Sequence, residues 1–573
     1  MVAELIRQHD LPEPLARALA GRGITPETAA GFLEPTLREH FPDPSSFLDM
    51  DRACAAILDA VEGRRQIRIF ADYDVDGATS AALLTRWLRA LGVEAPFYVP
   101  DRLTEGYGPS PLAFDRLKAS GADLVVTLDC GAAATDAIAH ATKIGLKVVV
   151  IDHHLMREAP PACEAVVNPN RPGCNSGQGH LAAAGVTLVL LAGLNREARR
   201  RGLFDDRPEP DIRQWLDLAA LGAICDVTAL TGFNRALTAQ GLKVMSRWQN
   251  LGLAALLAAS GSKDTRATTS TAGFVLGPRI NAGGRIGRAD LGALLLTTDD
   301  PAIARQTAEA LHELNAQRRD IEAEVTDTAL AMLQSQPDLD ARPVAIVAGE
   351  DWHPGVVGIV AGRLRERLRK ASIVIGLDPA TGIGRGSGRS QPGVNLGAAV
   401  QAAFDEGLLL AGGGHAMAAG LSVRKERIDD LRAFLDRVLA DAHASAMEAD
   451  SLEIDALLEV DSASRALCDA FERLAPYGPG NPEPLFALTD VASRDAVAMN
   501  GGHVRARLVG QNGRAIKAIA WRCADLPVGQ ALLSGAGGLS VVGRLKPDDW
   551  NGRKSVQFEV VDLHDPHWRP SAN

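Results

Sequence analysis

The stretch RIFADYDVDGATS, residues 68–80, places three aspartates on alternate positions directly after a short apolar run. These are Asp72, Asp74 and Asp76, and Gly77 follows them. Like charges at the end of a buried strand repel one another and lose their hydration, so the pattern is unfavourable unless something compensates for it. Either the segment is a solvated loop, or it binds a cation.

The surrounding sequence predicts a parallel sheet. Between about residues 66 and 230, strand-like runs alternate with stretches of helical spacing that end at or near glycine. The strand-like runs are QIRIFADYD, EAPFYVP, ADLVVTLDCG and LKVVVIDHH. This alternation is typical of βαβ units, in which ligands bind at the carboxyl ends of the strands. The aspartates of the opening stretch lie at such an end.

Three further parts are expected downstream. Residues 299–336 contain no glycine, and no proline after Pro301, which predicts one long charged helix that bridges two domains. A second α/β pattern follows to about residue 445, and short strands with Gly, Asn and Asp turns then predict a small β-barrel of OB type.

The expected fold class is therefore α/β, with two α/β domains joined by a long helix around a cleft, plus a C-terminal OB-type β-barrel. The expected boundaries are 1–45 for an N-terminal helical extension, 46–298 for the first α/β domain, 299–338 for the helix, 339–447 for the second α/β domain, and 448–573 for the barrel and tail.

Composition narrows the class of protein. A chain of 573 residues is too long for one core, and its net charge of −11 disfavours a nonspecific nucleic-acid coat protein. Seven scattered cysteines without a CxxC pair argue against a disulfide framework and a zinc–cysteine site. Because the sequence has neither a long apolar run nor a signal-like N-terminus, we expect a cytoplasmic protein that does not bind a membrane.

Further candidate ligands follow other predicted strands. Asp129 lies at the end of the strand-like run in VVTLDCG, and Asp152, His153 and His154 lie at the end of VVVIDHH. Asp226, in LAALGAICDVTAL, is expected at a third such strand end. Carboxylates and imidazoles without thiolates suit Mn²⁺ or Mg²⁺, and this many would hold two ions, as in sites that hydrolyse phosphoesters. A single DxD is more often a turn or a helix cap, and an aspartate such as Asp226 often only caps. The repetition at several strand ends favours the metal site.

At this point the sequence resembles a known family. DYDVDG, LDCG, DHH and CDVTAL are similar to the four motifs of the DHH phosphoesterase superfamily. DRLTEGYG, GPRINAGGR, GSGRS, GGGHAMAAG and PYGPGNPEPLF resemble its RecJ branch of single-strand-specific DNA exonucleases, and the likeness runs from about residue 50 to 565. The resemblance implies α/β domains of DHH and DHHA1 type, and Mn²⁺- or Mg²⁺-dependent hydrolysis of single-stranded DNA from the 5′ end to 5′-mononucleotides, in recombination and repair.

The resemblance also implies roles for the candidate ligands. One ion would be held by Asp76, Asp129, His153 and Asp226. The other would be held by Asp74 and Asp129, with help from Asp72, so that Asp129 bridges the two. His154 would lie near the scissile phosphate or outside the ligand set.

Other residues are candidates for holding the DNA strand. By composition GRGSGRS, residues 384–390, predicts a flexible loop, whereas the resemblance makes Ser387 and Arg389 candidates for gripping a 5′-terminal phosphate, together with Arg102. Tyr107 is expected either to stack on a base or to be a half-buried loop aromatic.

Two more candidates lie in glycine-rich segments. Arg279, in what reads as a glycine-rich turn, would stabilise charge on the reacting phosphoryl group. His415 follows GGG and opens an apolar helical run, where it would contact a nucleotide or cap the helix. Residues 351–353, DWH, end a strand of the second α/β pattern and could face the cleft.

The barrel is expected to supply a groove for the strand. Its basic residues are Arg505, Arg507, Arg514, Lys517, Arg544, Lys546, Arg553 and Lys554. Several of these could instead be ordinary outward-facing positions.

Two alternative functions stay open. One is a DHH-family phosphodiesterase for short oligonucleotides or dinucleotides, which would not need the barrel. The other is a non-catalytic single-stranded-DNA-binding scaffold, which would be expected to have lost ligands that are all present here. A nucleotide-binding dehydrogenase is excluded because no GxGxxG follows the first strand. The expected partners are single-stranded DNA, a single-strand-binding protein and a helicase, and the expected state is a monomer.

Overall fold

The computed structural model describes residues 1–573 except 103, 157, 337, 449–450, 549–553 and 567–573. The chain divides into two compact units. The smaller comprises residues 1–41, 227–240 and 452–573, and the larger comprises residues 42–226 and 241–451. Within the described ranges, none of the helices is both long enough and apolar enough to cross a membrane.

A five-stranded parallel sheet forms the first α/β part of the larger unit. Apolar, largely β-branched residues run almost unbroken through its strands, as expected for strands covered on both faces. The strand order is β2-β1-β3-β4-β5, and every pairing is parallel. The strands are β1 (Ile67–Ala71), β2 (Phe97–Tyr98), β3 (Leu124–Leu128), β4 (Lys147–Ile151) and β5 (Ala165–Val167).

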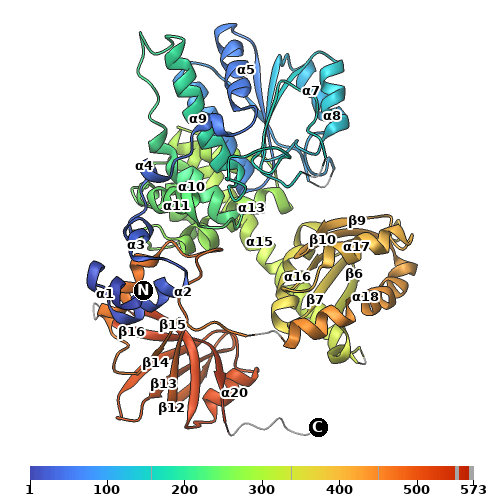
Figure 1. Ribbon diagram of the computed structural model, residues 1–573. Coiled ribbons are helices and arrows are strands. Elements are labelled where there is room, and N and C mark those ends of the chain that lie inside the picture. Colours follow the sequence, from blue (N-terminus) through green and yellow to red (C-terminus); the bar gives the residue numbers. More distant parts are fainter. Residues whose placement is uncertain (103, 157, 337, 449–450, 549–553, 567–573) are drawn as a thin grey trace. The chain divides into compact units, whose positions relative to one another are not determined.

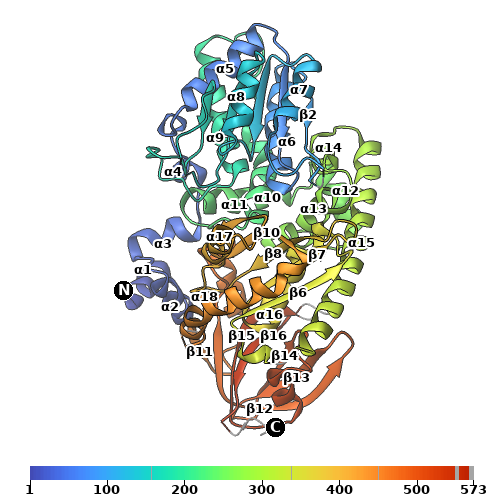
Figure 2. The same ribbon diagram turned by 90° about the vertical axis from the view of Figure 1, so that its right-hand side faces the viewer.

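Helices cover both faces of this sheet (Figures 1 and 2). Helices α7 (Pro111–Ala119) and α8 (Thr135–Lys143) pack on one face around Phe70 and Phe114. Helices α5 (Met50–Glu62), α6 (Val75–Ala90) and α9 (Ala183–Arg200) pack on the other. Further along the chain follow α10 (Leu216–Cys225), α11 (Gly232–Met245), α12 (Leu251–Ser260), a π-helical segment (Thr271–Leu276), α13 (Gly277–Ile286) and α14 (Leu291–Thr297).

The long helix predicted over residues 299–336 is present as α15 (Pro301–Gln334). Asp300 caps its N-terminus by accepting the backbone N–H groups of Ala302 and Ile303, and Pro301 occupies the first turn, where its missing N–H costs nothing.

A mixed sheet follows α15, in the order β6-β7-β8-β10-β9, with only β6 and β7 parallel. Helix α16 (Pro354–Leu368) packs with α15 on one face, around Val347 and Val374. Helices α17 (Leu396–Asp405) and α18 (Ile428–Glu448) pack on the other face, around Ile373 and Ile375. The strands are β6 (Val344–Glu350), β7 (Ala371–Leu377), β8 (Ile383–Arg389), β9 (Ala411–His415) and β10 (Ala418–Arg424).

Three glycine-rich segments differ from the local predictions. GSGRS belongs to strand β8 rather than a flexible loop, because Gly384, Gly386 and Gly388 alternate along it and let Ile375, Leu421 and Leu396 pack directly against its backbone. GPRINAGGR forms helix α13 rather than a turn. His415 ends strand β9 and does not open a helix, so its predicted role as a helix cap is wrong.

The smaller unit contains a closed barrel. Its strands follow the order β12-β13-β14-β16-β15, and a β12–β15 pairing closes the circle, which is the topology of an OB-fold. These strands are β12 (Phe486–Met499), β13 (His503–Val509), β14 (Ala515–Ala520), β15 (Leu539–Asp548) and β16 (Ser555–His564). A short strand, β11 (Ala456–Leu458), pairs with β12. The same part of the chain contains helices α19 (Arg465–Phe471) and α20 (Pro527–Leu533).

The barrel shares its core with the start of the chain. Leu5, Leu15 and Leu19 belong to the same apolar cluster as Phe486 and Phe558 of the barrel. They come from helices α1 (Val2–His9) and α2 (Glu13–Gly21), which α3 (Pro26–Leu33) and α4 (Leu37–His40) follow. The sequence alone did not indicate this pairing.

Candidate metal centre

Four adjacent strands end at one level of the first sheet. Asp72, Asp129, Asp152 and Asn168 each directly follow the last residue of β1, β3, β4 and β5. The backbone N–H groups of the three aspartates each donate to the last carbonyl of the neighbouring strand, at 3.0–3.2 Å. The parallel register therefore brings the carboxylates predicted from separate strands to one edge.

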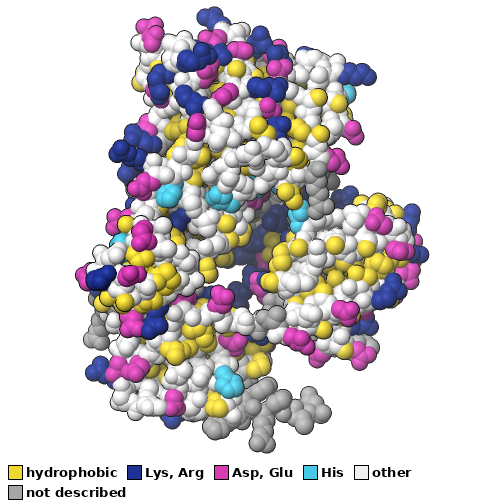
Figure 3. Space-filling view, viewed as in Figure 1, with side chains coloured by type: hydrophobic (Ala, Val, Ile, Leu, Met, Phe, Trp, Pro, Cys, Tyr) yellow, Lys and Arg dark blue, Asp and Glu magenta, His cyan; other side chains and the backbone are white. Residues whose placement is uncertain are grey.

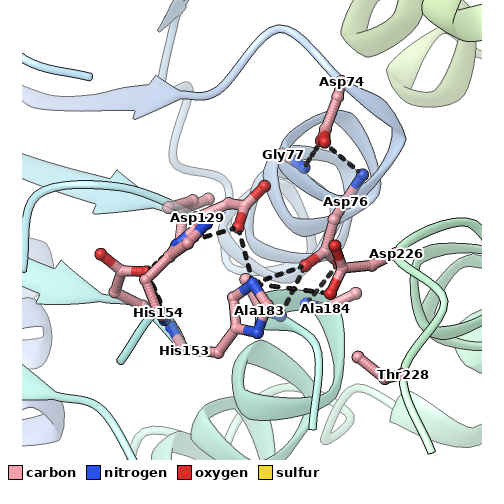
Figure 4. Close-up of polar contacts among 12 residues, drawn as sticks. Asp74, Asp76, Gly77, Asp129, His153, His154, Ala183, Ala184, Asp226 and Thr228 are labelled. Carbon is pink, nitrogen blue, oxygen red and sulfur yellow. Dashed lines mark hydrogen bonds and ion pairs between the residues drawn. The ribbon is translucent and has the colours of Figure 1, made fainter. Parts of the chain in front are cut away.

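Asp76 is held at the N-terminus of another helix (Figure 4). It lies in the first turn of α6, is 1% exposed, and accepts the backbone N–H groups of Ala183 and Ala184 at 2.6 and 2.9 Å. Gly222 of α10 makes room for it, because a Cβ there would lie 2.6 Å from Asp76 Oδ1. The positive end of α9 thus supports the ionised carboxylate.

His153 forms the centre of the first candidate ligand group. Its Nε2 lies 3.3 Å from Asp129 Oδ1, 3.6 Å from Asp226 Oδ2 and 3.9 Å from Asp76 Oδ2. Burial lowers the pKa of His153 to about 4, so that the ring is neutral at pH 7 and its Nε2 lone pair can bind a metal ion. Asp76, His153 and Asp226 could together hold one ion.

The second candidate group consists of Asp72, Asp74 and Asp129, whose carboxylate oxygens lie within 4.8 Å of one another. Asp74 also caps α6, since its side chain accepts the backbone N–H groups of Asp76 and Gly77 at 2.9 and 3.1 Å. The three aspartates of the opening stretch therefore do not point to one place: Asp72 and Asp74 belong to this group, and Asp76 to the other.

The electrostatics of these groups fit divalent cations. Burial, reinforced by the neighbouring carboxylates, raises the pKa values of Asp72, Asp76 and Asp129 well above the usual range, and raises that of Asp226 to about 7. Within the described part of the chain, Asp72 Oδ1, Asp129 Oδ1 and His153 Nε2 are buried and form no hydrogen bond. A donor set of oxygen and imidazole with unpaired buried atoms is suited to Mn²⁺ or Mg²⁺.

Asp152 orients His154 rather than joining either ligand group. Its Oδ1 accepts the backbone N–H groups of His153 and His154, and its Oδ2 accepts that of Ala132. His154 Nδ1 lies 2.8 Å from Asp152 Oδ1. Burial lowers the pKa of His154, but this hydrogen bond and the negative charges of the surrounding aspartates together raise it to about 9. His154 is therefore a cation at neutral pH.

Tyr107 lies beside this histidine. Its hydroxyl donates to the Asp129 carbonyl at 3.1 Å and lies 3.3 Å from His154 Nδ1, and the two rings meet edge to face at 5.7 Å. The residue is 54% exposed and lies in a loop, so it is the half-buried loop aromatic of the sequence analysis, and stacking on a base stays a prediction.

Asp226 follows a helix and not a strand. It is the C-terminal cap of α10 and faces His153 from there. The expectation that it ends a strand is wrong, because the apolar run LAALGAIC is a helix buried on nearly all sides and has no amphipathic period.

Sequence reasoning missed two asparagines that hold the histidine segment. Asn168 Nδ2 donates to the His154 carbonyl at 2.8 Å, and Asn170 Nδ2 donates to the His153 carbonyl at 2.6 Å. Both lie just after β5 in VVNPN. The sequence did contain a signal for them. An asparagine directly follows a short apolar run, just as an aspartate follows each of the three other strands of this parallel sheet.

Cationic side chains lie next to the carboxylates. The Arg102 guanidinium sits over the ring of Tyr73, 5.3 Å from its centroid, and Tyr73 lies between Asp72 and Asp74 in sequence. Arg102 and Arg285 line a cavity of about 90 Å³ with His353, which caps α16 through Nδ1.

Ser387 and Arg389 face the same region from β8. Arg389 Nη1 donates to Ser387 Oγ at 3.0 Å, and burial together with Arg102 lowers the pKa of Arg389. Gly358 of α16 leaves space for them, since a Cβ there would lie 3.0 Å from Ser387 Oγ. His415 shares a cross-strand row with Arg389, because both pair with Ala418 of β10. Paired positions of neighbouring strands face the same side of a sheet.

Arg279 is not brought to the carboxylates. Its Nε donates to His312 Nδ1 at 3.3 Å and its Nη1 to the Val275 carbonyl at 2.6 Å, on the side of α13 that faces α15. Arg285, on the same helix, interacts electrostatically with Asp74 and donates to the Gly355 carbonyl at 3.0 Å. The expected role of Arg279 at the reacting phosphoryl group stays a prediction.

Comparison with known proteins places each folded part. Residues 66–223 match the model of the DHH family N-terminal domain, residues 342–441 that of the DHHA1 domain, and residues 454–562 that of the RecJ OB domain. The single-stranded-DNA-specific exonuclease RecJ of Bacillus subtilis is 33% identical over 99% of this chain and 70% of its own length. The corresponding protein of Escherichia coli is 34% identical over 83% of each chain.

Solved structures agree with these matches. The crystal structure of RecJ from Thermus thermophilus in complex with Mn²⁺ superposes with a TM-score of 0.79 and 29% identity, over 99% of this chain and 78% of that one. The complex of the same protein with Mg²⁺ gives a TM-score of 0.74. The structure of an exonuclease RecJ bound to manganese gives a TM-score of 0.58 and 31% identity, over 69% of this chain and 95% of that one.

Proposed function

Because this chain belongs to the RecJ family of single-stranded-DNA-specific exonucleases, we propose that its metal centre removes 5′-mononucleotides from the 5′ end of a single DNA strand. The family, the fold class and a metal-dependent exonuclease activity on single-stranded DNA are established by the matches. The direction of degradation, the number of ions and the roles of individual residues belong to the proposal.

Two ions would be held by the two ligand groups. Asp76, His153 and Asp226 would hold one, Asp72 and Asp74 the other, and Asp129 would serve both, because its Oδ1 lies 3.3 Å from His153 Nε2 and its carboxylate also belongs to the second group. Divalent ions in such a site polarise the phosphoryl oxygen and activate water as the nucleophile. The donor set contains no thiolate, unlike the cysteine-rich sites that are typical of structural zinc.

The protein's own residues would then position the strand. His154, kept protonated by Asp152, carries a positive charge beside Asp129 and can donate a proton or a hydrogen bond to the scissile phosphate. Tyr107 donates to the Asp129 carbonyl and limits the movement of the His154 ring. Its exposed face is available for a base.

The direction of degradation is supported by the cationic pocket. Arg102, Ser387 and Arg389 would bind a terminal 5′-phosphate with charge-assisted hydrogen bonds, and His415 would contact the first nucleotide from the same sheet face. The observation that carries the proposal is the position of Arg102 over Tyr73, because it sets an anion pocket directly beside the aspartate ligands. A strand end fixed there presents its first internal linkage to the ions.

The test uses a single strand labelled at either end. Incubation of the full chain with Mn²⁺ should release the 5′ label as a mononucleotide at once and the 3′ label only as the last product, and EDTA or Asp129→Ala should abolish both. Release of the 3′ label first would overturn the proposed direction. Comparison with a dinucleotide substrate separates this function from that of a short-oligonucleotide phosphodiesterase, which would prefer the dinucleotide.

The expected protein partners and compartment also stay predictions. A single-strand-binding protein and a helicase should bind the purified chain in pull-down experiments, and light scattering should give the mass of a monomer. Fractionation should place the protein in the cytoplasm.

A further inference from the structure

A second cationic cavity, of about 460 Å³, lies within the larger unit. Its walls come from the end of α12, the π-helical segment, and helices α13, α15 and α16. The space-filling view shows Lys and Arg side chains beside α15, the helix that supplies four of the lining residues (Figure 3). A cavity of this size is in the range of pockets that accept a nucleotide-sized ligand. None of the residues assigned to the metal centre or to the 5′-phosphate pocket lines this cavity. Arg279 does line it, and its predicted role at the reacting phosphoryl group is untested.

The cavity has an excess of positive charge. Arg279, Arg318, Arg319 and Arg363 line it, and the only acidic residue in its wall is Glu322. Glu322 is shared by two of them, since Arg318 Nη1 lies 2.8 Å from Oε2 and Arg363 Nε lies 3.0 Å from Oε1. Four guanidinium groups against one carboxylate leave three positive charges in excess.

The remaining two arginines have no acidic partner among the residues that the structure describes. Arg279 bonds only to His312 and to the Val275 carbonyl, and Arg319 forms no hydrogen bond or ion pair with any described residue. Burial, followed by the repulsion of Arg319, lowers the pKa of Arg279, so each positive charge here destabilises the other. Like charges concentrated in a wall of low polarity are expected where an anion binds.

A buried donor in the wall is also unpaired. Arg318 is 9% exposed, and its Nε forms no hydrogen bond within the described structure. Its other two nitrogens are bound to Glu322 and Asn315, which fix the guanidinium plane in the wall. A buried donor without an acceptor costs free energy, and an anion in the cavity would supply the acceptor.

An aromatic ring stands free at the cavity wall. Phe274 is 79% exposed, although only 4% of the chain is aromatic and half of its phenylalanines are buried. It lies in the π-helical segment, a rare form that is frequent at functional sites. A cationic groove with a free ring is the arrangement by which proteins bind the backbone and a base of a single strand.

We propose that this cavity binds a backbone phosphate of the single-stranded DNA, with a neighbouring base stacked on Phe274. The inference rests on the proposed function and adds a second attachment point to it, lined by residues other than those of the 5′-phosphate pocket. Its ligand is a phosphodiester of the bound strand rather than a free mononucleotide or inorganic phosphate.

The test compares Arg319→Gln and Phe274→Ala in the full chain, because both side chains are exposed and their loss should not affect folding. Binding of a 5′-phosphorylated 20-nucleotide oligo(dT) is measured by fluorescence anisotropy in EDTA. Each substitution should weaken binding about tenfold, and Arg319→Gln should lower the salt slope by about 0.7. Arg319→Lys should restore most of the affinity. A 5′-phosphorylated dinucleotide has no phosphodiester beyond the scissile one, so its turnover should be unchanged.

Matched controls remove the same groups elsewhere. Arg305→Gln, on the same helix, and Phe404→Ala, an exposed phenylalanine on α17, should leave binding of the long strand unchanged. Unchanged binding in Arg319→Gln and Phe274→Ala, or an equal loss on the dinucleotide, would overturn the inference. The inference would also be overturned if inorganic phosphate or dTMP displaced the strand from the wild type but not from Arg319→Gln. The site would then bind free anions rather than a phosphodiester of the strand. A wild type that degrades no single strand at all would instead refute the proposed function.

Discussion

His154 is tied to Asp152 by a contact of 2.8 Å between its Nδ1 and Asp152 Oδ1, at the end of strand β4. The same carboxylate accepts two consecutive backbone N–H groups and that of Ala132. Asp152, which belongs to neither ligand group, therefore orients the imidazole and makes the largest contribution that favours its protonated form.

Asp152→Asn should lower exonuclease activity by about 10- to 100-fold while leaving metal binding nearly intact. The amide keeps the shape but removes the negative charge, so the pKa of His154 should fall from about 9 toward its ordinary value. Turnover gives the first effect, and NMR titration of the His154 ring in metal-free protein gives the second. An unchanged His154 pKa would contradict the assigned role of Asp152.

Titration with Mn²⁺ should reveal two sites in the wild type. Asp226→Asn should weaken only the site that contains His153, whereas Asp129→Asn should weaken both, because Asp129 lies in both groups. Calorimetry or EPR of the free ion measures the stoichiometry. Saturation with metal at about 100 times Kd should stabilise the protein by about 2.7 kcal/mol for each site. A single site in the wild type would exclude the two-ion arrangement.

Arg389→Ala should weaken binding of 5′-phosphorylated single strands by about 10- to 100-fold, because it removes charge-assisted hydrogen bonds worth about 1.5–3 kcal/mol. Strands with a 5′-hydroxyl should be affected much less. Anisotropy with both oligonucleotides in EDTA separates the two cases. Arg424→Ala, an exposed arginine on neighbouring strand β10, is the matched control. Equal losses on the two strands would argue against a 5′-phosphate pocket.

Arg507→Gln tests the barrel. Arg494, Arg507 and Lys517 form one cross-strand row, and Arg507 is exposed between buried neighbours on β13. The substitution should reduce the salt slope for long single strands by about 0.7 and leave short ones unaffected. Arg17→Gln on α2 removes an exposed charge elsewhere in the same unit and should have no effect. A point substitution is required, since removal of the barrel would expose the core that it shares with α1 and α2. Arg553, predicted as part of the same groove, lies outside the described residues.

Asp217→Asn should stabilise the protein at neutral pH but not in acid. Asp217 is buried on α10, and burial raises its pKa to about 6 from 3.8. The folded state therefore holds the proton more tightly than the unfolded state, and the wild type loses stability as pH rises from about 4 to above 6. The loss is about 3 kcal/mol at most. Melting temperatures of both proteins should coincide near pH 4 and differ by several degrees at pH 7.5; a constant difference would contradict this explanation.

The sequence predicted the metal edge because its signals are local. Asp72 and Asp129 each follow a largely apolar strand, His153 lies two residues after a third, and parallel strands bring their carboxyl ends together. Asp226 was placed on the wrong kind of element because a fully buried helix has no period that distinguishes it from a strand.

Other features depend on contacts that no local pattern contains. Strand β8 is rich in glycine, a poor strand former, and is stable because Leu396 and Leu421 fill the space that its glycines leave. Helix α13 contains three glycines, and Gly284 allows it to approach the Tyr73 carbonyl, where a Cβ would lie 2.7 Å away. Both segments look like loops until their neighbours are known.

The core that joins helices α1 and α2 to the barrel has a consequence for synthesis of the protein. Leu5 and Leu15 leave the ribosome first, but Phe486 and Phe558 are translated more than 450 residues later. At about 5–20 residues per second, the first helices wait roughly 20–100 s for their partner. During that time the nascent chain carries unprotected leucines, so its yield in the cell should depend on chaperones that bind the N-terminus.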